Sequence, residues 1–191
     1  MLIFFSAPKS FCENFAVIVS WRLKRGGGHC LTFGMRVLAI DIGTVTGYAV
    51  GDASRVLDSG VLDCTPGKGL RASSEAGMID RYVRFQAGLN RLAGKAGFDV
   101  VAWEDVKAHS SVQAGHVYGG LVATLMLACN EWNAKPIAVN VKTIKKHATG
   151  NGSAMKSVMV KRASSKFNIP IVDDNHADAL WLLNYVQTEI L

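Results

Sequence analysis

The segment Val37-Leu38-Ala39-Ile40-Asp41 places an acidic residue directly after four consecutive apolar residues. Apolar residues that do not alternate with polar ones are typical of a strand covered on both faces, as in a sheet with helices on either side. Gly43 and Gly47 follow at positions suited to a turn or to the close approach of another segment. We therefore expect an α/β domain in which this segment is a buried strand.

Strand and helix patterns alternate along the rest of the chain. Two short strands, 48–51 and 55–62, follow closely enough to pair as antiparallel hairpins. A helix over about 73–95 is expected because its apolar residues recur every three or four positions, namely Met78, Tyr82, Phe85, Leu89 and Leu92. Next come a strand at 100–103, a helix at 112–132, a strand at 136–139 and further helices. This order predicts a mixed five-stranded sheet, three antiparallel strands and then parallel ones, with helices on both faces.

The composition narrows the class of protein and of partner. Of the 191 residues, 49% are hydrophobic, which is typical of a globular domain rather than a disordered chain. The 21 Lys and Arg residues exceed the 15 Asp and Glu residues, and the net charge of +6 favours a polyanionic partner. Four cysteines without a Cys-x-x-Cys pair and five histidines outside zinc-finger spacing argue against a disulfide scaffold and structural zinc. From the cysteine pattern we expect a reduced, cytoplasmic protein. We also expect no membrane partner, because the apolar runs near the front are far shorter than the roughly 20 residues that span a bilayer.

Residues 1–34 differ from the remainder, since they show no sustained period and include the flexible run Arg25-Gly26-Gly27-Gly28. We expect them to be an N-terminal appendage to a single domain at 35–191. Our hypothesis is that Met35 is the natural start and that 1–34 are upstream sequence read through, not native. The alternative is a basic, acid-poor targeting segment.

Two acids stand where apolar strands end. Asp41 interrupts the first strand, and a lone buried carboxylate there is costly unless it is paired, hydrogen-bonded or bound to a metal. Glu104 directly follows the strand at 100–103, at the end where a sheet of this kind places ligands.

A third acidic group lies at 173–178, with the sequence Asp-Asp-Asn-His-Ala-Asp. Asp174 or Asn175 is expected to cap a helix and to leave Asp178 on the same face one turn later. Converging carboxylates without a histidine or cysteine set suit Mg²⁺ or Mn²⁺. Two such ions about 4 Å apart would activate a water and stabilise the leaving oxygen in phosphodiester cleavage. Taken singly, each acid is also explained by a structural role in a turn or at a helix cap.

Residues 142–166 are basic and contain no acid. Within them, Thr149-Gly150-Asn151-Gly152-Ser153 is a glycine-containing loop before a helix from about 154, and the backbone N–H groups of such a loop can receive a phosphate. The flanking lysines would track a nucleic-acid backbone. The alternative is a solvated helix face whose other side is a buried stripe of Met155, Val158, Met159, Ala163 and Phe167.

In the order of these pieces the chain resembles the RuvC family of Holliday junction resolvases, in the ribonuclease H-like superfamily, over nearly all of residues 36–188. The matching pieces are Ala39-Ile40-Asp41-Ile42-Gly43 with Gly47, Ala102-Trp103-Glu104, the segment 149–156, and Asn175-His176-Ala177-Asp178-Ala179-Leu180. The first piece is shared with other members of the superfamily, whereas the last two are more specific. The compact length and the terminal motif look more like phage or prophage members, which would place the protein in the host cytoplasm.

The resemblance implies a ribonuclease H-like nuclease domain at 35–191 that forms a homodimer on four-way or branched DNA and nicks two strands symmetrically. It also implies two Mg²⁺ ions per active site, with Mn²⁺ as a substitute. Asp41, Glu104 and Asp178 match the family's metal-binding acids, and Lys145 and Lys156 match its two active-site lysines, which would offset charge at the scissile phosphate. DNA contacts are expected from Lys107, Lys142, Lys145, Lys146, Asn151, Ser153, Lys156 and Lys161.

Two positions depart from the family's pattern. A fourth acid or a histidine is usual three residues before the last Asp, where this chain has Asn175. The carbonyl oxygen of Asn175 or the carboxylate of Asp174 would then be the fourth metal ligand. The family's aromatic residue that wedges into the junction has no match, because Lys107 occupies that region, so the sequence preference is expected to differ.

Three alternative functions share parts of the pattern. A nuclease of the pre-ribosomal RNA processing type begins with a similar Asp-x-Gly strand, but that family is usually shorter, and the lysine and glycine loop argues against it. Sugar-kinase and actin-like ATPases use a similar strand to reach phosphate, but they need two lobes and this domain supplies one. A catalytically inert junction-binding module is the third, motivated by Asn175.

Overall fold

A computed structural model describes residues 34–191, so the expected appendage lies outside the described residues except for Gly34. The strands are β1 (Val37–Asp41), β2 (Val45–Gly51), β3 (Val56–Asp63), β4 (Val100–Asp105) and β5 (Lys135–Asn140). The helices are α2 (Glu75–Ala93), α3 (Val112–Trp132), α4 (Val141–Thr149), α5 (Lys156–Phe167) and α6 (Asp174–Glu189).

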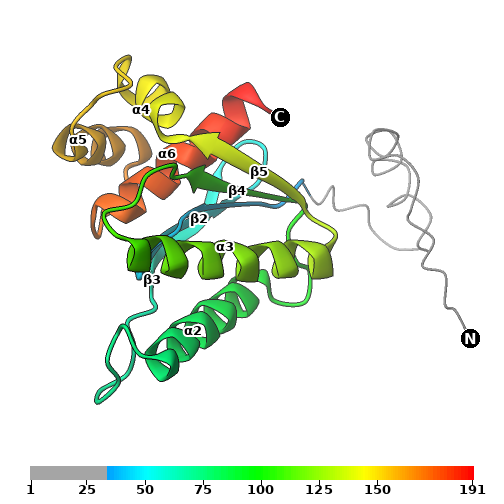
Figure 1. The fold of residues 1–191 in the computed structure, drawn as a ribbon. Helices are drawn as coiled ribbons and strands as arrows, with labels where there is room; N and C mark the ends of the chain where they lie inside the picture. The colour runs from blue at the N-terminus through cyan, green and yellow to red at the C-terminus, as the bar shows by residue number, and fades with distance from the viewer. Residues whose placement is uncertain (1–33) are drawn as a thin grey trace, which may run out of the picture. The chain divides into compact units, whose positions relative to one another are not determined.

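The strands form one mixed five-stranded sheet in the order β3-β2-β1-β4-β5 (Figure 1). β1 pairs antiparallel with β2 and parallel with β4. β3 continues the antiparallel side next to β2, and β5 continues the parallel side next to β4. This confirms the predicted α/β class and the predicted change from antiparallel to parallel strands.

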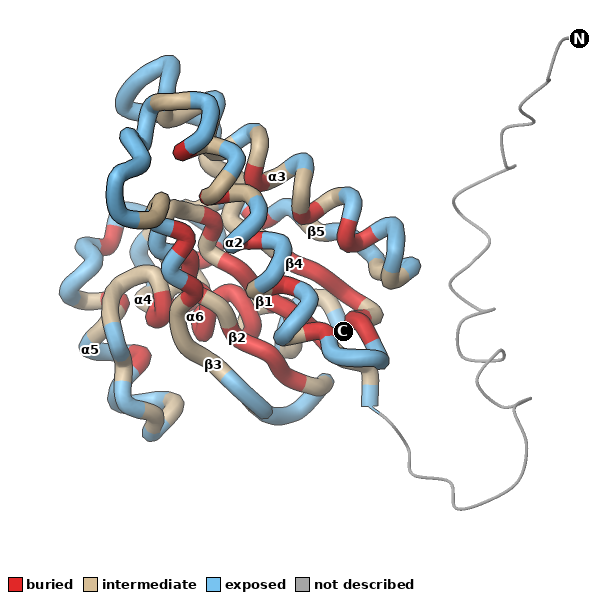
Figure 2. The backbone as a smooth tube through the Cα atoms, turned by 90° about the horizontal axis from the view of Figure 1, so that it is seen from below, coloured by how far each residue is buried: buried red, intermediate tan, exposed pale blue. Residues whose placement is uncertain are grey.

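Helices cover both faces of the sheet, as predicted. Val37 and Ala39 of β1 belong to the core that the sheet forms with α4, α5 and α6. Leu38 and Ile40 belong to the core on the other face, formed with α2 and α3. All four side chains are fully buried, and the buried stretches run along the central strands in Figure 2. The unbroken apolar run thus reflects a strand that is covered on both sides.

Several element boundaries differ from the sequence prediction, and two of them concern Glu104 and the start of α5. β4 continues to Asp105 because its parallel pairing with β5 includes Glu104 and Asp105, so Glu104 lies within the strand and not after it. α5 begins at Lys156, and the preceding Met155 is 70% exposed and not part of a buried stripe. Glu104 is therefore held by strand pairing, which fixes its direction more firmly than a loop would.

The helix α3 packs against α2 on one face of the sheet. Within residues 34–191, it is the one helix long and apolar enough to cross a membrane by length and composition. However, Leu121 and Leu125 of α3 are fully buried in the core shared with α2. A Cβ atom on Gly120 would lie 2.3 Å from the ring of Tyr82, so the glycine permits this close helix packing. The place of α3 in the core accounts for the buried part of its apolar sequence, which is 22% of the apolar window.

Candidate active site

The carboxylates of Asp41 and Glu104 are neighbours because their strands pair in parallel. Ile40 of β1 lies opposite Trp103 of β4, which places the following residue of each strand side by side at the same end of the sheet. The carboxyl groups of Asp41 and Glu104 lie within hydrogen-bonding reach of each other. Two of the three predicted acids are thus brought together by strand register.

Burial and mutual repulsion dominate the electrostatics of this pair. Burial, followed by the charges of Glu104 and Asp178, raises the pKa of Asp41 well above its ordinary value, against the opposing charge of Lys156. Burial also raises the pKa of Glu104, although a hydrogen bond with Asp41 and the charges of Lys145 and Lys156 act in the opposite direction. The two carboxyl groups therefore resist full ionisation without a further positive charge.

The helix α6 carries the third acid, Asp178, to the same place. Gly47 of β2 lies opposite Asp41 in the antiparallel β1–β2 pair. The backbone of Asn175, in the first turn of α6, lies directly over Gly47. Asp178 follows one turn later on the helix, and its charge acts on Asp41. The close contact between α6 and β2 thus sets the position of the third carboxylate.

The carboxyl group of Asp178 has the strongest signs of an unmet need for a positive partner. Burial, followed by the charge of Glu104, raises the pKa of Asp178 to about 7, although Lys156 and Lys145 oppose this. Its Oδ1 atom is buried and accepts no hydrogen bond within the described residues. A buried carboxylate oxygen without a partner is costly, which points to a ligand that is bound during function.

The start of α6 differs from the sequence prediction. Asp173, and not Asp174 or Asn175, caps the helix, because its carboxylate accepts a hydrogen bond from the backbone N–H of His176 at 2.8 Å. Because Asp173 is the cap, the side chains of Asp174 and Asn175 are free to make other contacts.

Both candidates for a fourth metal ligand are engaged elsewhere in the structure. The carboxylate of Asp174 forms an ion pair with Lys156, which lowers the pKa of Asp174. The side-chain amide of Asn175 donates a hydrogen bond to the backbone carbonyl of Val45 at 3.1 Å. This leaves the side-chain carbonyl oxygen of Asn175 as its available acceptor.

The two predicted active-site lysines flank the carboxylates from α4 and from the start of α5. The ion pair with Asp174 raises the pKa of Lys156, whose charge also acts on Asp41 and Asp178. The charge of Lys145, which is half-buried on α4, acts on Glu104 and Asp178. Positive charge thus approaches the acidic site from the side of the basic helices.

The other predicted DNA-binding residues form an exposed surface beside the site. Of the predicted residues, those exposed on α4, the following loop and α5 are Lys142, Lys146, Asn151, Ser153 and Lys161. The loop is ordered by its own hydrogen bonds, since the Asn151 side chain accepts from the backbone N–H of Ser153 at 2.9 Å. Lys107 lies apart from them, after β4, where it pairs with Asp105.

Tyr118 is a site residue that the sequence pattern did not identify. Its hydroxyl donates a hydrogen bond to the backbone carbonyl of Glu104 at 2.8 Å and accepts one from the backbone N–H of Val106 at 3.2 Å. These bonds fix the end of β4 that carries the catalytic candidate. The sequence pattern placed Tyr118 on the apolar side of α3. Only its hydroxyl group, which needs a hydrogen-bond partner when buried, could have suggested that it holds the end of β4.

The residues present fit a hard divalent cation. Within the described part of the chain, no three Asp, Glu, His or Cys side chains stand close enough together, as the structure has them, to hold a metal ion. The donor set nevertheless suits one, because it combines carboxylate oxygens with a buried Asp178 oxygen that has no partner. The raised pKa values of Asp41 and Asp178 would fall if a cation were bound beside them. Asp41, Glu104 and Asp178 would be the ligands.

Comparisons with known proteins relate the fold to one group of solved structures. No protein-family model matches the chain, and no curated protein matches it by sequence. The structure titled T. thermophilus RuvC in complex with Holliday junction substrate matches with a TM-score of 0.62 at 20% identity, covering 78% of this chain and 90% of that one. The chain has the fold of RuvC.

Two further structures support this RuvC fold. The RuvC of Thermus thermophilus in a second structure gives a TM-score of 0.60 at 21% identity, again over 78% of this chain and 90% of that chain. The yeast mitochondrial Holliday junction resolvase Ydc2 gives 0.57 at 16% identity, over 80% of this chain and 78% of that chain. The predicted ribonuclease H-like architecture, with its mixed sheet and helices on both faces, is confirmed.

Proposed function

We propose that the chain is a structure-selective endonuclease of the RuvC family that resolves four-way DNA junctions, known as Holliday junctions, by symmetric phosphodiester hydrolysis with two Mg²⁺ ions. The observation that carries this proposal is the convergence of acids from β1, β4 and α6 on one buried site flanked by two lysines, within a RuvC fold. Solved relatives of this fold include one described with a Holliday junction substrate.

The acids would act as the metal-binding groups of the site. Asp41, Glu104 and Asp178 would hold two Mg²⁺ ions, or Mn²⁺ in their place, with Asn175 or Asp174 as a fourth ligand. When bound, these ions would supply Lewis-acid activation of a water and stabilisation of the leaving oxygen. The carboxylates, which are largely buried, would hold the ions in place.

The lysines would position the DNA strand and balance its charge. Lys156 and Lys145 lie where their ammonium groups can offset negative charge on the scissile phosphate. α5 begins without a side-chain cap, so its first backbone N–H groups are available beside Lys156 to receive a phosphate. The exposed residues of α4 and α5, together with Lys107, would contact the flanking backbone.

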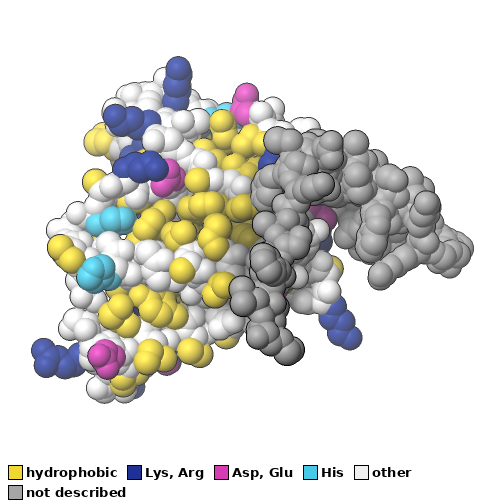
Figure 3. Space-filling view, turned by 45° about the vertical axis from the view of Figure 1, so that its right-hand side comes forward, with side chains coloured by type: hydrophobic (Ala, Val, Ile, Leu, Met, Phe, Trp, Pro, Cys, Tyr) yellow, Lys and Arg dark blue, Asp and Glu magenta, His cyan; other side chains and the backbone are white. Residues whose placement is uncertain are grey.

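Symmetric cleavage of a four-way junction requires two active sites, and we propose a homodimer to supply them. The layer formed by α2 and α3 exposes apolar side chains, with Ile79, Val83 and Leu127 each more than half exposed. Figure 3 shows hydrophobic side chains gathered along the face that α3 crosses. Apolar patches of this kind are typical of surfaces that another subunit covers. The complex would act in the cytoplasm, which is the host cytoplasm for a phage-encoded chain.

The test compares substrates of the same sequence and different shape. The full chain is incubated with Mg²⁺ and end-labelled four-way, Y-shaped and linear DNA, and with an RNA hairpin. We expect paired nicks at matching positions in two strands of the four-way junction and little cleavage of linear duplex. Binding without nicks would support an inert junction-binding module instead, and preferential cleavage of RNA would support the pre-ribosomal RNA type of nuclease.

A further inference from the structure

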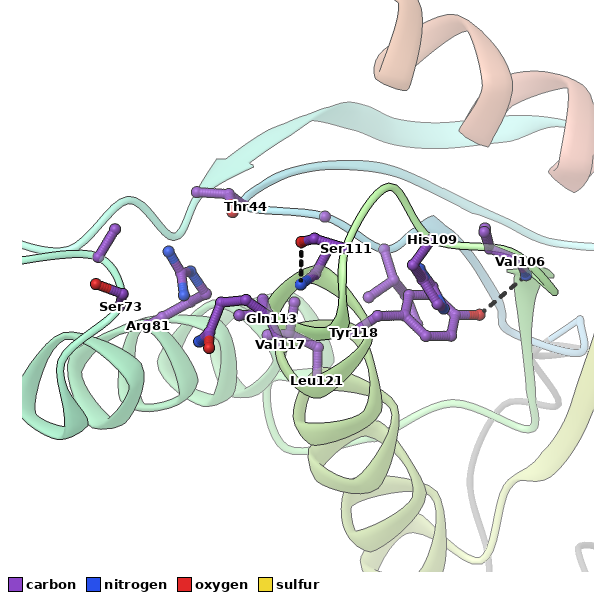
Figure 4. A pocket seen from close by; sticks show the side chains of 14 residues that line it. Thr44, Ser73, Arg81, Val106, His109, Ser111, Gln113, Val117, Tyr118 and Leu121 are labelled. Carbon is purple, nitrogen blue, oxygen red and sulfur yellow. Dashed lines mark hydrogen bonds between the residues drawn. The ribbon is translucent and has the colours of Figure 1, made fainter.

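A cavity of about 370 Å³ lies next to the carboxylate site, between the turn after β1 and the layer of α2 and α3. Its lining includes Gly43 and Thr44 from that turn, Ser73 from the loop before α2, and Ser111 and Gln113 at the start of α3 (Figure 4). Gly43 lies only two residues after Asp41. The cavity and the candidate active site therefore share the same turn.

Arg81 of α2 lines this cavity and lacks a partner. The residue is 4% exposed, and its Nε and Nη1 atoms are buried without a hydrogen bond among residues 34–191. No carboxylate of the described chain forms an ion pair with it, and none lines the cavity. A buried guanidinium without a counter-charge destabilises a fold by several kcal/mol. An anion bound beside the guanidinium would supply the missing counter-charge.

The thiol of Cys64, on which the charge of Arg81 acts, does not supply that counter-charge. Arg81 acts on the thiol of Cys64, but burial outweighs this effect and raises the pKa of Cys64 to about 11. The thiol is therefore neutral at pH 7. The positive charge of Arg81 consequently stays uncompensated inside the protein.

The other groups around the cavity also favour a negative ligand. The side chain of Ser111 caps α3 by accepting from the backbone N–H of Ala114 at 3.1 Å. α3 has no acidic residue in its first turn, so the positive end of its dipole is not offset. Hydroxyl and amide groups of Thr44, Ser73 and Gln113 can donate hydrogen bonds at the rim, and Figure 4 shows the side chain of Arg81 among these residues.

We propose that this cavity, the anion pocket, binds a phosphate group of the DNA strand that enters the candidate active site, with Arg81 as the anchoring residue. The proposal rests on the proposed nuclease function and adds a second phosphate site beside the scissile one. A strand phosphate is favoured over a free anion because the pocket shares the turn after β1 with Asp41, past which the cleaved strand would run. The anchored phosphate would fix which linkage reaches the carboxylates.

The first test places a negative charge at the rim of the anion pocket. Gln113 is exposed, so Gln113→Glu keeps the fold, and an acid in the first turn of α3 favours the helix. Gln86 is an exposed residue of α2 outside the pocket, so Gln86→Glu makes the same charge change there and is the matched control. Binding of each full chain to a four-way junction is measured by fluorescence anisotropy in EDTA, which prevents nicking. We expect affinity about tenfold weaker for Gln113→Glu than for Gln86→Glu, because like charges repel at short range.

The second test identifies the phosphate. Each phosphate near the branch point is replaced in turn by a neutral methylphosphonate, and binding is compared for wild type and Arg81→Met. We expect one position per strand at which the replacement weakens wild-type binding but has no further effect on Arg81→Met. We also expect Arg81→Met to reduce the salt slope of binding by about one, and Arg81→Lys to restore part of the affinity.

Thermal denaturation separates this role from a structural one and from a free-anion site. Removing an unpaired buried charge should leave the melting temperature of Arg81→Met equal to or above that of wild type. A lower melting temperature together with unchanged junction affinity would overturn the proposal. The proposal would also be overturned if inorganic phosphate raised the melting temperature of wild type while no methylphosphonate replacement weakened its binding to the junction. If Arg81→Met does not fold, the proposal is tested by the junction affinity of Gln113→Glu and by the methylphosphonate replacements measured with wild type.

These measurements distinguish an incorrect anion-pocket proposal from an incorrect nuclease proposal. A wild-type chain that nicks the junction, with equal affinities for Gln113→Glu and Gln86→Glu, contradicts only the anion pocket. A wild-type chain that neither binds nor nicks branched DNA contradicts both.

Discussion

A Cβ atom on Gly47 would lie 1.9 Å from the backbone carbonyl oxygen of Asn175, so the start of α6 rests on β2 at a distance that only glycine permits. Gly47 is also the partner of Asp41 in the β1–β2 ladder. Because Asp178 is one turn from Asn175 on α6, this contact determines how near Asp178 comes to Asp41. The glycine is thus part of the active-site geometry, although it contributes no side chain.

Replacement of Gly47 by alanine is expected to displace α6 from the sheet. The three atoms nearest to the new Cβ cannot yield easily, since they are the backbone C and O of Asn175 and the backbone N of His176. We expect Gly47→Ala to lower the free energy of unfolding by at least about 2 kcal/mol and to reduce nicking of a four-way junction strongly. Gly119→Ala is the control, because no atom lies within 4 Å of a Cβ there and alanine favours the helix. Equal stability of the two variants in urea denaturation would show that α6 adapts without cost.

Neutral analogues of the two strand-borne acids separate binding from cleavage. Asp41→Asn and Glu104→Gln keep the shape of each side chain and remove its charge. We expect both variants to fold and to bind a four-way junction with wild-type affinity or better, and to lose nicking in Mg²⁺. A variant that still nicks at the wild-type rate would eliminate a metal-binding role for that residue.

The stability of the metal-free protein should depend on pH through Asp178. Its folded-state pKa of about 7 exceeds the ordinary value of 3.8, so the folded chain holds this proton more tightly than the unfolded chain. Stability from this group is therefore fully present below about pH 4 and is lost as the pH rises towards 7. In EDTA, we expect Asp178→Asn to melt about 2–5 °C above wild type at pH 7.5, with a smaller difference at pH 5. A variant less stable than wild type at pH 7.5 would show that the structure favours the charged form.

Two of the three lysines of α5, Lys156 and Lys161, should have different roles. Lys156 lies among the acids, whereas Lys161 is exposed further along the helix. We expect Lys156→Ala to slow single-turnover cleavage more than it weakens binding, and Lys161→Ala mainly to reduce the salt dependence of binding. If both variants slow cleavage equally at saturating protein, Lys156 is not part of the reaction site.

The main elements of the fold were predictable because their residue patterns are local. The unbroken run before Asp41 indicates a strand covered on both faces, and strand register then explains why Asp41 meets Glu104. The extension of β4 through Glu104 was not predictable, since it depends on pairing with β5, where Glu104 lies opposite Val139, far along the chain. The predicted cap of α6, Asp174 or Asn175, lies one or two residues after the actual cap, because Asp173, Asp174 and Asn175 are all good capping residues and only the backbone angles distinguish them.

Arg81 shows where a periodic pattern is insufficient. The residue lies four positions before the buried Phe85 and thus on the same side of α2. Arginines at the margin of an apolar stripe usually extend their charged end into water, so the sequence gives no sign of burial. The packing of α2 against α3 and the turn after β1 decides it, and that packing is a tertiary property.

Direct measurement of ion binding tests whether acids from remote segments share divalent cations. Mn²⁺ bound to the full chain on a four-way junction is counted by electron paramagnetic resonance, with Asp80→Asn as a control for a surface acid that pairs with Arg84. We expect about two ions per wild-type or Asp80→Asn chain and a clear loss in Asp41→Asn and Asp178→Asn. Equal Mn²⁺ binding by all four proteins would contradict the metal-dependent mechanism.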